Sequence, residues 1–289
     1  MSERFNSYPV IFTHVPRSAG TTLVSIMKRF YPKDAQFNFY VREQAGTTAQ
    51  AMEEFKNLPE QKRGRLKLLQ GHTSFGIHQY YDSYTYITLF RDPVERIVSY
   101  YYYTLKRPRH YLHNILISNR MRLEDFIASG LSTELDNIQT RQISGSQNVP
   151  YGQCTEKMLE TAKLNLVRYY AVTGITEHFD ESVMLMKRRL GWTYPFYVKQ
   201  NIIDDRPPKS QIPESVVRHI EQHNALDVQL YRFALERFRA TVEGQDESFQ
   251  TELDKFRKYN AWLQRMSGRP YAAGLGLTLW GLYAKLRRQ

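Results

Sequence analysis

The stretch FTHVPRSAGTTLVSIMKRF, from Phe12 to Phe30, changes from a strand pattern to a helix pattern across a loop of small side chains. The apolar run over 8–15 predicts a buried strand, and apolar residues at helical spacing predict a helix over 21–30. Between them, small side chains leave successive backbone N–H groups accessible to a ligand. A strand, loop and helix in this order form the first half of a β–α unit, which indicates an α/β fold.

The rest of the chain continues the alternation of strands and helices. Strand patterns occur at three further places: 67–71, 84–90 and 169–173. Helix patterns dominate the part after the last strand: 180–190, 214–223, 225–242 and 246–266. This alternation predicts an α/β fold with a central, mainly parallel sheet flanked by helices. Ligands of such sheets bind beyond the carboxyl ends of the strands, where we expect the opening loop, Arg91 and His72 to meet.

We predict a main domain over 1–245 and a helical C-terminal extension over 246–289. The end of the extension, 268–289, is a run of mostly apolar residues that finishes in basic ones. This run is too short to span a bilayer. It is compatible with contact to a membrane surface, or with packing on the domain or on an oligomer partner.

The formal net charge of +11 indicates an electropositive surface or cleft, which favours anionic partners. A single cysteine, Cys154, excludes an internal disulfide framework and fits a reducing compartment. The N-terminal sequence MSERFNSYPV has no apolar run of signal-peptide length. We therefore predict a cytoplasmic protein, whose tail is the one segment suited to the periphery of a membrane.

The loop PRSAGTT is suited to hold a phosphate or sulfate group. Its residues are an arginine followed by five small ones: Arg17, Ser18, Ala19, Gly20, Thr21 and Thr22. Backbone N–H groups and the positive end of the following helix attract anions, while hydroxyls and the guanidinium add further donors. The nucleoside-triphosphate motif G-x-x-x-x-G-K-[ST] requires two glycines and a lysine directly before the Ser or Thr, which this loop lacks. Packing alone also explains small residues at such a turn, so the loop by itself leaves both interpretations open.

A second anion-binding element is predicted where the run YTYITLF ends. Arg91 follows this strand directly, and Ser99 lies two turns into the next helix. That helix has strong start signals, with Asp92 as the cap, Pro93 at the first position and Glu95 completing a capping box. The alternative is that Arg91 only pairs with a surface acid and that Ser99 is an ordinary helix residue.

Together the two elements resemble the sulfotransferases that use 3'-phosphoadenosine 5'-phosphosulfate (PAPS). HVPRSAGTTL is similar to their 5'-phosphosulfate loop, and LFRDPVERIVSYYYY is similar to their 3'-phosphate motif. The resemblance is nearest to the heparan sulfate 2-O-sulfotransferases and related carbohydrate sulfotransferases. LLQGHTSFGIH resembles the Gly-His segment of that branch, and DNIQTRQISG, GITEHFDES and RPP follow in the expected order. The similarity covers roughly residues 8–240 and implies a P-loop-like sulfotransferase fold.

The resemblance implies a role for each matching residue. The loop residues 18–22 would bind the 5' end of PAPS, and Arg91 and Ser99 would bind its 3'-phosphate. His72 matches the catalytic base, which takes the proton of the acceptor hydroxyl. Arg17 stands where the family usually has a lysine that steadies the leaving oxygen, and we expect Arg17 to remain catalytic because it keeps the charge. The implied product is 3',5'-adenosine diphosphate, and no metal is expected.

The remaining polar residues give weaker signals. HIEQH, at 219–223, lacks the glutamate that a zinc protease motif requires after its first histidine, so no metal site is predicted. Arg141 is the basic residue expected to reach the acceptor. The stretch KRPRH, at 106–110, is either a solvated basic face or a contact for an anionic acceptor. The tyrosine run 100–103 is expected to divide between core and cleft, and His14 is expected as a packed, hydrogen-bonded residue at a strand end.

Two other classes of protein remain as alternatives. A P-loop kinase-like phosphotransferase would bind ATP with magnesium, whereas the PAPS-dependent enzyme would bind 3',5'-adenosine diphosphate without metal. A basic nucleic-acid-binding protein is suggested only by the charge, and no recognition-helix or RNA-binding motif supports it. We therefore predict no nucleic-acid partner. The acceptor is expected to carry a hydroxyl on a sugar, a lipid-linked intermediate or a small metabolite, and the basic charge suits an anionic acceptor.

Overall fold

The computed structural model describes residues 8–40, 48–200 and 206–267 of the chain. Five strands form one sheet in the order β2-β3-β1-β4-β5, and every neighbouring pair is parallel. The strands are β1 Val10–Thr13, β2 Gln36–Phe39, β3 Leu68–Gly71, β4 Thr85–Phe90 and β5 Tyr170–Ile175. The predicted α/β fold with a parallel sheet is therefore confirmed.

The central strand β1 is buried along its whole length. It lies between β3 and β4, so that Thr13 is paired with Gly71 on one side and with Thr88 on the other. An unbroken apolar run is what a strand needs when helices cover both faces of its sheet. The pairing aligns the carboxyl ends of the three middle strands, which sets the positions of the residues that follow them.

Strand β2 was missed in the sequence analysis, which predicted four strands. It has four residues, and its alternating Phe37 and Phe39 pack on Phe55. Phe55 belongs to helix α2, Thr48–Lys56, which was also missed. A two-residue alternation is too short to stand out from loop sequence, and here the tertiary contact with α2 decides the structure.

Helices account for most of the remaining described residues. They are α1 Gly20–Met27, α2 Thr48–Lys56, α3 Glu60–Gly64, α4 Pro93–Lys106, α5 His113–Ser118, α6 Leu123–Ala128, α7 Ile138–Ser144, α8 Glu156–Arg168, α9 Phe179–Leu190, α10 Glu214–His223, α11 Ala225–Glu243 and α12 Glu247–Ser267. Helices α8, α9 and α11 pack against β5, and α2 packs against β2. No helix in the described part of the chain combines the length and the apolar character needed to cross a membrane.

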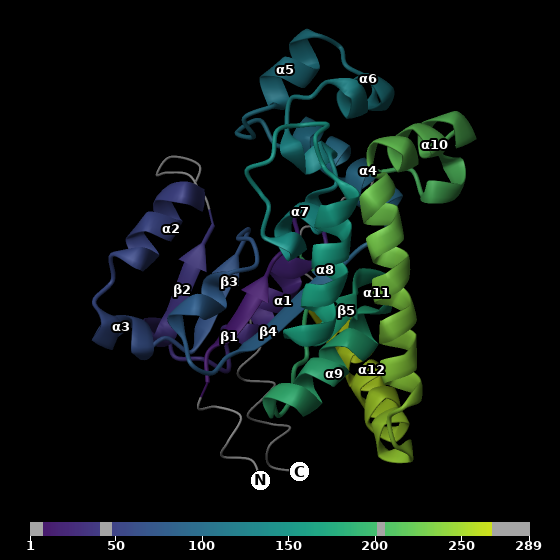
Figure 1. The fold of residues 1–289 in the computed structure, drawn as a ribbon. Coiled ribbons are helices and arrows are strands. Elements are labelled where there is room, and N and C mark those ends of the chain that lie inside the picture. Colours follow the sequence, from purple (N-terminus) through teal and green to yellow (C-terminus); the bar gives the residue numbers. More distant parts are fainter. Residues whose placement is uncertain (1–7, 41–47, 201–205, 268–289) are drawn as a thin grey trace.

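Helices α4, α5, α6 and α10 form a lobe with its own small hydrophobic core. Val94, Ile97, Phe126 and Ile220 are buried together in this core. Figure 1 shows the lobe beyond the tips of the strand arrows, above the sheet. It therefore stands over the edge of the sheet where ligands of parallel sheets bind.

Helix α4 begins as predicted, but the capping box is wrong. Asp92 Oδ1 accepts a hydrogen bond from the backbone N–H of Glu95 at 3.0 Å, and Pro93 occupies the first turn. The Glu95 carboxylate does not return to the cap; it pairs with Arg91 at 3.2 Å and with Arg206 at 2.6 Å. The backbone N–H of Asp92 instead donates to Glu177 at 3.1 Å. The two arginines attract the carboxylate that a local capping box would have used.

The predicted C-terminal extension contains helix α12, which packs against α9. Phe249, Leu253 and Phe256 of α12 are buried in the same hydrophobic cluster as the sheet. Lys187 of α9 and Glu252 of α12 form an ion pair at 2.7 Å across the contact. The first part of the extension is thus built into the core, and the expected membrane or oligomer contact of 268–289 lies outside the described residues.

A buried carboxylate fixes the start of α7. Asp227, on α11, accepts hydrogen bonds from the backbone N–H of Gln139 at 3.1 Å and from the backbone N–H and hydroxyl of Thr140 at 2.7 and 2.9 Å. The side chain of Gln139 then bonds both backbone groups of Arg91, at 3.0 Å each. One acid on α11 therefore determines where the end of β4 lies.

We predict that Asp227→Ala lowers the free energy of unfolding by about 3 kcal/mol or more, because it leaves three buried donors without an acceptor. Urea unfolding measures this loss. Asp254→Ala, which removes an exposed carboxylate on α12, is the matched control and should change stability by less than about 0.5 kcal/mol. Equal stability of the two variants would contradict the role given to Asp227.

Candidate active site

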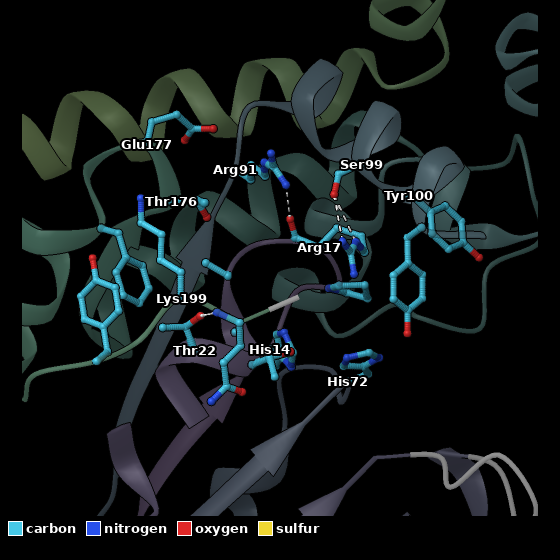
Figure 2. A pocket seen from close by; sticks show the side chains of 18 of the residues that line it. His14, Arg17, Thr22, His72, Arg91, Ser99, Tyr100, Thr176, Glu177 and Lys199 are labelled. Atoms are coloured by element: carbon cyan, nitrogen blue, oxygen red, sulfur yellow. Dashed lines mark hydrogen bonds between the residues drawn. The ribbon is translucent and has the colours of Figure 1, made fainter. Parts of the chain in front are cut away.

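A cleft lies at the carboxyl edge of the sheet, with a volume of about 880 Å³. The residue that directly follows each of the five strands lines it: His14, Tyr40, His72, Arg91 and Thr176. A cleft of this size accommodates a ligand as large as a nucleotide. The expected meeting of the opening loop with Arg91 and His72 is observed (Figure 2).

The opening loop has the backbone geometry of an anion-binding nest. Arg17 and Ala19 have positive φ angles, 66° and 56°, and α1 begins at the next residue, Gly20. Such angles are strained for residues with a Cβ, and they turn successive N–H groups toward one point. The hydroxyl of Ser18 is buried and has no hydrogen-bond partner among the described residues. The loop thus presents donors that a bound anion would satisfy.

Arg91 is fixed against this loop. One of its terminal nitrogens donates to the backbone carbonyl of Arg17 at 2.8 Å, and the other pairs with Glu95. Its Nε, one terminal nitrogen of Arg206 and the Thr176 hydroxyl are buried without a partner within the described ranges. All three residues line the cleft. Buried donors left open in this way are typical of a site for an anion.

Arg17 is held by two residues of α4. Its Nε and one terminal nitrogen donate to the hydroxyl of Ser99 at 3.2 and 3.1 Å (Figure 2). The guanidinium lies 4.1 Å from the centre of the Tyr103 ring, in a cation–π contact. Burial and the nearby charge of Arg91 lower the pKa of Arg17 to about 10, so its side chain remains charged at neutral pH. Ser99 and Tyr103, one turn apart, therefore set the direction in which Arg17 points.

His72 reaches the cleft because a glycine precedes it. Gly71 has a φ of 149°, and a Cβ there would lie 2.8 Å from the backbone of Phe39 on β2. The strands can therefore approach each other only with glycine at the end of β3. Burial and the charge of Arg17 lower the pKa of His72 to about 4. The imidazole is neutral at pH 7, which is the form that can accept a proton.

Two carboxylates lie among these cations and were missed in the sequence analysis. Glu134 lines the cleft, and its negative charge acts on Arg17. Glu177 accepts hydrogen bonds from the backbone of Asp92 at 3.1 Å and from Tyr231 at 3.2 Å. Burial raises the pKa of both glutamates. No local pattern marks these positions, because their partners are far away in the sequence.

Arg141 does not reach the cleft, and the expected acceptor contact is wrong. Its side chain is fully buried and bonds Asp136 and the backbone carbonyls of Val149 and Pro150. A charged group so enclosed stays where its acceptors are. Arg141 therefore fixes the segment after α7.

Other basic and aromatic side chains also line the cleft. They are Tyr100, Tyr103, Arg109, His110 and Tyr111, from α4 and the segment after it. The tyrosine run divides between core and cleft as expected, because Tyr100 is buried whereas the ring of Tyr103 contacts the guanidinium of Arg17. The KRPRH stretch contributes two of the lining residues, Arg109 and His110. Lys199 and Gln200 line the cleft beside the opening loop, and the backbone N–H of Gln200 donates a hydrogen bond to the hydroxyl of Thr22 at 3.1 Å.

Fold and cleft together define a class: a parallel α/β protein in which two arginines and a nest-like loop, both suited to an anion, lie beside a neutral histidine. The chain belongs to the sulfotransferase family, whose sequence profile matches residues 4–234, and it is a sulfotransferase. It is 23% identical over 254 residues to heparan sulfate 2-O-sulfotransferase 1 of Gallus gallus, covering 80% of this chain and 70% of the relative. The human protein of that name is 22% identical with the same coverage. A heparin sulfate O-sulfotransferase of Drosophila melanogaster is 24% identical over 260 residues, 79% of this chain and 71% of the relative.

These relatives contradict the predicted cytoplasmic location. Heparan sulfate sulfotransferases are lumenal enzymes of the Golgi. The prediction rested on one cysteine and on an N-terminus without an apolar run, and neither feature determines the compartment of an enzyme.

The neutral histidines make stability depend on pH. Because the pKa of both His14 and His72 lies below the ordinary 6.5, the unfolded chain binds more protons than the folded one between pH 6.5 and about 4. We predict that the contribution of these histidines to the free energy of unfolding falls as the pH decreases through this window, by roughly 2 kcal/mol at pH 5 for His72 alone. Urea unfolding at pH 7 and pH 5 measures the loss. His72→Asn should lose less stability than the wild type between these pH values, and an equal loss would count against a neutral His72.

Proposed function

We propose that this sulfotransferase moves the sulfuryl group of PAPS to a sugar hydroxyl, with His72 as the general base. The observation that carries the proposal is the convergence, in one cleft, of the opening loop, the Arg91–Ser99 element and a neutral imidazole. Each alone is compatible with packing or with a surface ion pair. Their meeting is what a two-ended anionic donor next to a nucleophile requires.

The residues of the cleft fit PAPS. The loop residues 18–22 would hold its 5'-phosphosulfate end, and Arg91 and Ser99 its 3'-phosphate. The unpartnered donors on Arg91 and Arg206 support this assignment, because both residues line the cleft and these donors are buried without an acceptor in the described part of the chain. The hydroxyl of Ser18 is unpartnered too, but it does not line the cleft. When bound, PAPS supplies the sulfuryl group and leaves as 3',5'-adenosine diphosphate.

His72 is assigned the proton transfer. Its neutral imidazole accepts the proton of the acceptor hydroxyl as the hydroxyl oxygen attacks sulfur. The loop N–H groups and Arg17 would stabilise the donor oxygen that gains charge as its bond to sulfur breaks. Arg17 has a second effect, because its charge lowers the pKa of His72 and keeps the base unprotonated.

The surroundings of Arg17 suit arginine better than the lysine usual in the family. A guanidinium can donate two hydrogen bonds to Ser99 while its flat face lies on Tyr103. An ammonium group is a compact point charge and cannot make both contacts in this geometry. This supports the expectation that Arg17 keeps the role of that lysine.

The acceptor belongs to the sugars or polysaccharides, as the relatives' names indicate. We propose an anionic glycan for this chain. We assign the acceptor to the part of the cleft lined by α4 and the segment after it. This part combines tyrosine rings, which suit sugar faces, with Arg109 and His110. The net charge of +11 favours a polyanion over a neutral oligosaccharide.

The test is transfer of radiolabelled sulfate from PAPS to desulfated heparan sulfate, compared with a neutral oligosaccharide. We predict that His72→Ala lowers kcat by at least about 100-fold while binding of 3',5'-adenosine diphosphate is retained. His219→Ala, on the distant helix α10, is the matched control and should keep wild-type turnover.

Arg17→Ala should also lose turnover at saturating PAPS, because the leaving oxygen loses its cation. Near-normal turnover of Arg17→Ala would refute the role of Arg17, and near-normal turnover of His72→Ala would refute the base. Label that appears on the neutral oligosaccharide and not on the heparan backbone would refute the anionic acceptor.

A further inference from the structure

A second histidine, His14, lies beside His72 in the cleft. It directly follows β1, and its ring centre is 4.6 Å from that of His72, with the two planes at 77°. Figure 2 shows the two imidazoles as neighbours below Arg17. His14 is packed and hydrogen-bonded, as expected from the sequence. Its contact with His72 was not foreseen, because α1, β2, α2, α3 and β3 all lie between the two residues in the sequence.

The opening loop makes room for the His14 ring. A Cβ on Gly20 would lie 1.9 Å from both Cδ2 and Nε2 of His14, far inside contact distance. Gly20 has no Cβ, so the imidazole packs against the first residue of α1. In the sequence, the small residues of this loop indicate room for a ligand. At Gly20 the structure adds another reason, which is the position of His14.

A hydrogen bond fixes the His14 ring in its plane. Nδ1 of His14 and the hydroxyl of Tyr40 lie 2.9 Å apart. Burial raises the pKa of Tyr40 far above its ordinary value, so the phenol stays protonated. Burial, with the neighbouring His72 and the charge of Arg17, lowers the pKa of His14, so its imidazole is neutral. The ring of Phe12 stacks on the His14 ring, with the two ring centres 5.3 Å apart.

The imidazole of His72 packs against two other rings. Within the described residues, neither nitrogen of its imidazole makes a hydrogen bond to the protein, whereas edge contacts join it to His14 and to Tyr40, whose ring centre is 5.2 Å away. Tyr40 and His14 also contact each other edge to face, at 5.5 Å. Each of the rings of His14, Tyr40 and His72 therefore contacts the other two, and the hydrogen bond between His14 and Tyr40 fixes two of the three.

We propose that His14, locked by Tyr40 and seated against Gly20, is the residue that positions the imidazole of His72. This inference rests on the assignment of His72 as the base. A general base without an orienting hydrogen bond needs another restraint, because a displacement of about 1 Å can cost two orders of magnitude in rate. The rings of His14 and Tyr40 supply that restraint, since their planes lie at 77° and 80° to the plane of the His72 ring.

His14 is not itself the base. Only 5% of its surface is exposed, and its Nδ1 is engaged by Tyr40. Its Nε2 packs against Gly20, where a Cβ would lie 1.9 Å away. A hydroxyl of a polysaccharide acceptor has access to the partly exposed His72, and not to the enclosed ring behind it.

The experiment compares His14→Ala and Tyr40→Phe with the wild type by steady-state kinetics, by calorimetry with 3',5'-adenosine diphosphate, and by NMR titration of His72 in the free protein. Tyr81→Phe is the matched control, because it removes a tyrosine hydroxyl that bonds the backbone of Arg63, away from the cleft. Tyr40→Phe deletes a single oxygen, so it tests the proposal even if His14→Ala fails to fold.

We expect His14→Ala to lower kcat by about 10- to 100-fold and Tyr40→Phe by about 3- to 10-fold. The affinity for 3',5'-adenosine diphosphate should stay within about twofold of the wild type in both. In His14→Ala the pKa of His72 should rise from about 4 toward the ordinary 6.5, because the ring loses a wall and gains water. The acid limb of the pH–rate profile should move in the same direction. Tyr81→Phe should change none of these quantities.

Two results would overturn the proposal. An unchanged His72 pKa with unchanged kcat in both variants would show that His14 does not restrain the base. A loss of affinity for 3',5'-adenosine diphosphate equal to the loss of kcat would make His14 a donor-binding residue instead. If His72→Ala itself kept full activity, the proposed base would be wrong, yet the NMR titration would still report whether His14 restrains the His72 ring.

Discussion

The common direction of the five strands is the constraint on which the site depends. In a parallel sheet all carboxyl ends lie at one edge, so the residue after each strand is delivered to the same place. Here those residues are His14, Tyr40, His72, Arg91 and Thr176. Five residues spread over 163 positions of the sequence thus line one cleft, although no sequence motif links them. The lobe of α4, α5, α6 and α10 then closes one side of the edge (Figure 1).

Charge and burial in the cleft are coupled. Burying Arg17 and Arg91 costs solvation, which Ser99, Glu95 and the Arg17 carbonyl offset in part. The donors that remain open would provide the affinity for the proposed anion. Burial and the charge of Arg17 lower the pKa of His72, so the proposed anion binding and the proposed general-base chemistry would both use the same arginine.

The sequence predicted those parts of the site that are local. The strand, loop and helix around Arg17 and the start of α4 at Asp92 are read from adjacent residues, and both are found in place. The failures are contacts between distant segments. Tyr40 follows a strand too short to show a periodicity, and Glu134 joins Arg17 only through the tertiary fold. Arg141 was placed at the acceptor because its segment resembles a recurring stretch of the family, whereas an unforeseen ion pair with Asp136 buries it.

The most direct measurement of the central claim is calorimetric titration, in the presence of EDTA, of 3',5'-adenosine diphosphate and of adenosine 5'-monophosphate. The two ligands differ only in the 3'-phosphate, which is assigned to Arg91 and Ser99. We predict that 3',5'-adenosine diphosphate binds at least about tenfold more tightly, a difference of about 1.4 kcal/mol, and that Arg91→Ala removes the difference. Equal affinities in the wild type, or tight binding of ATP that requires magnesium, would contradict the account.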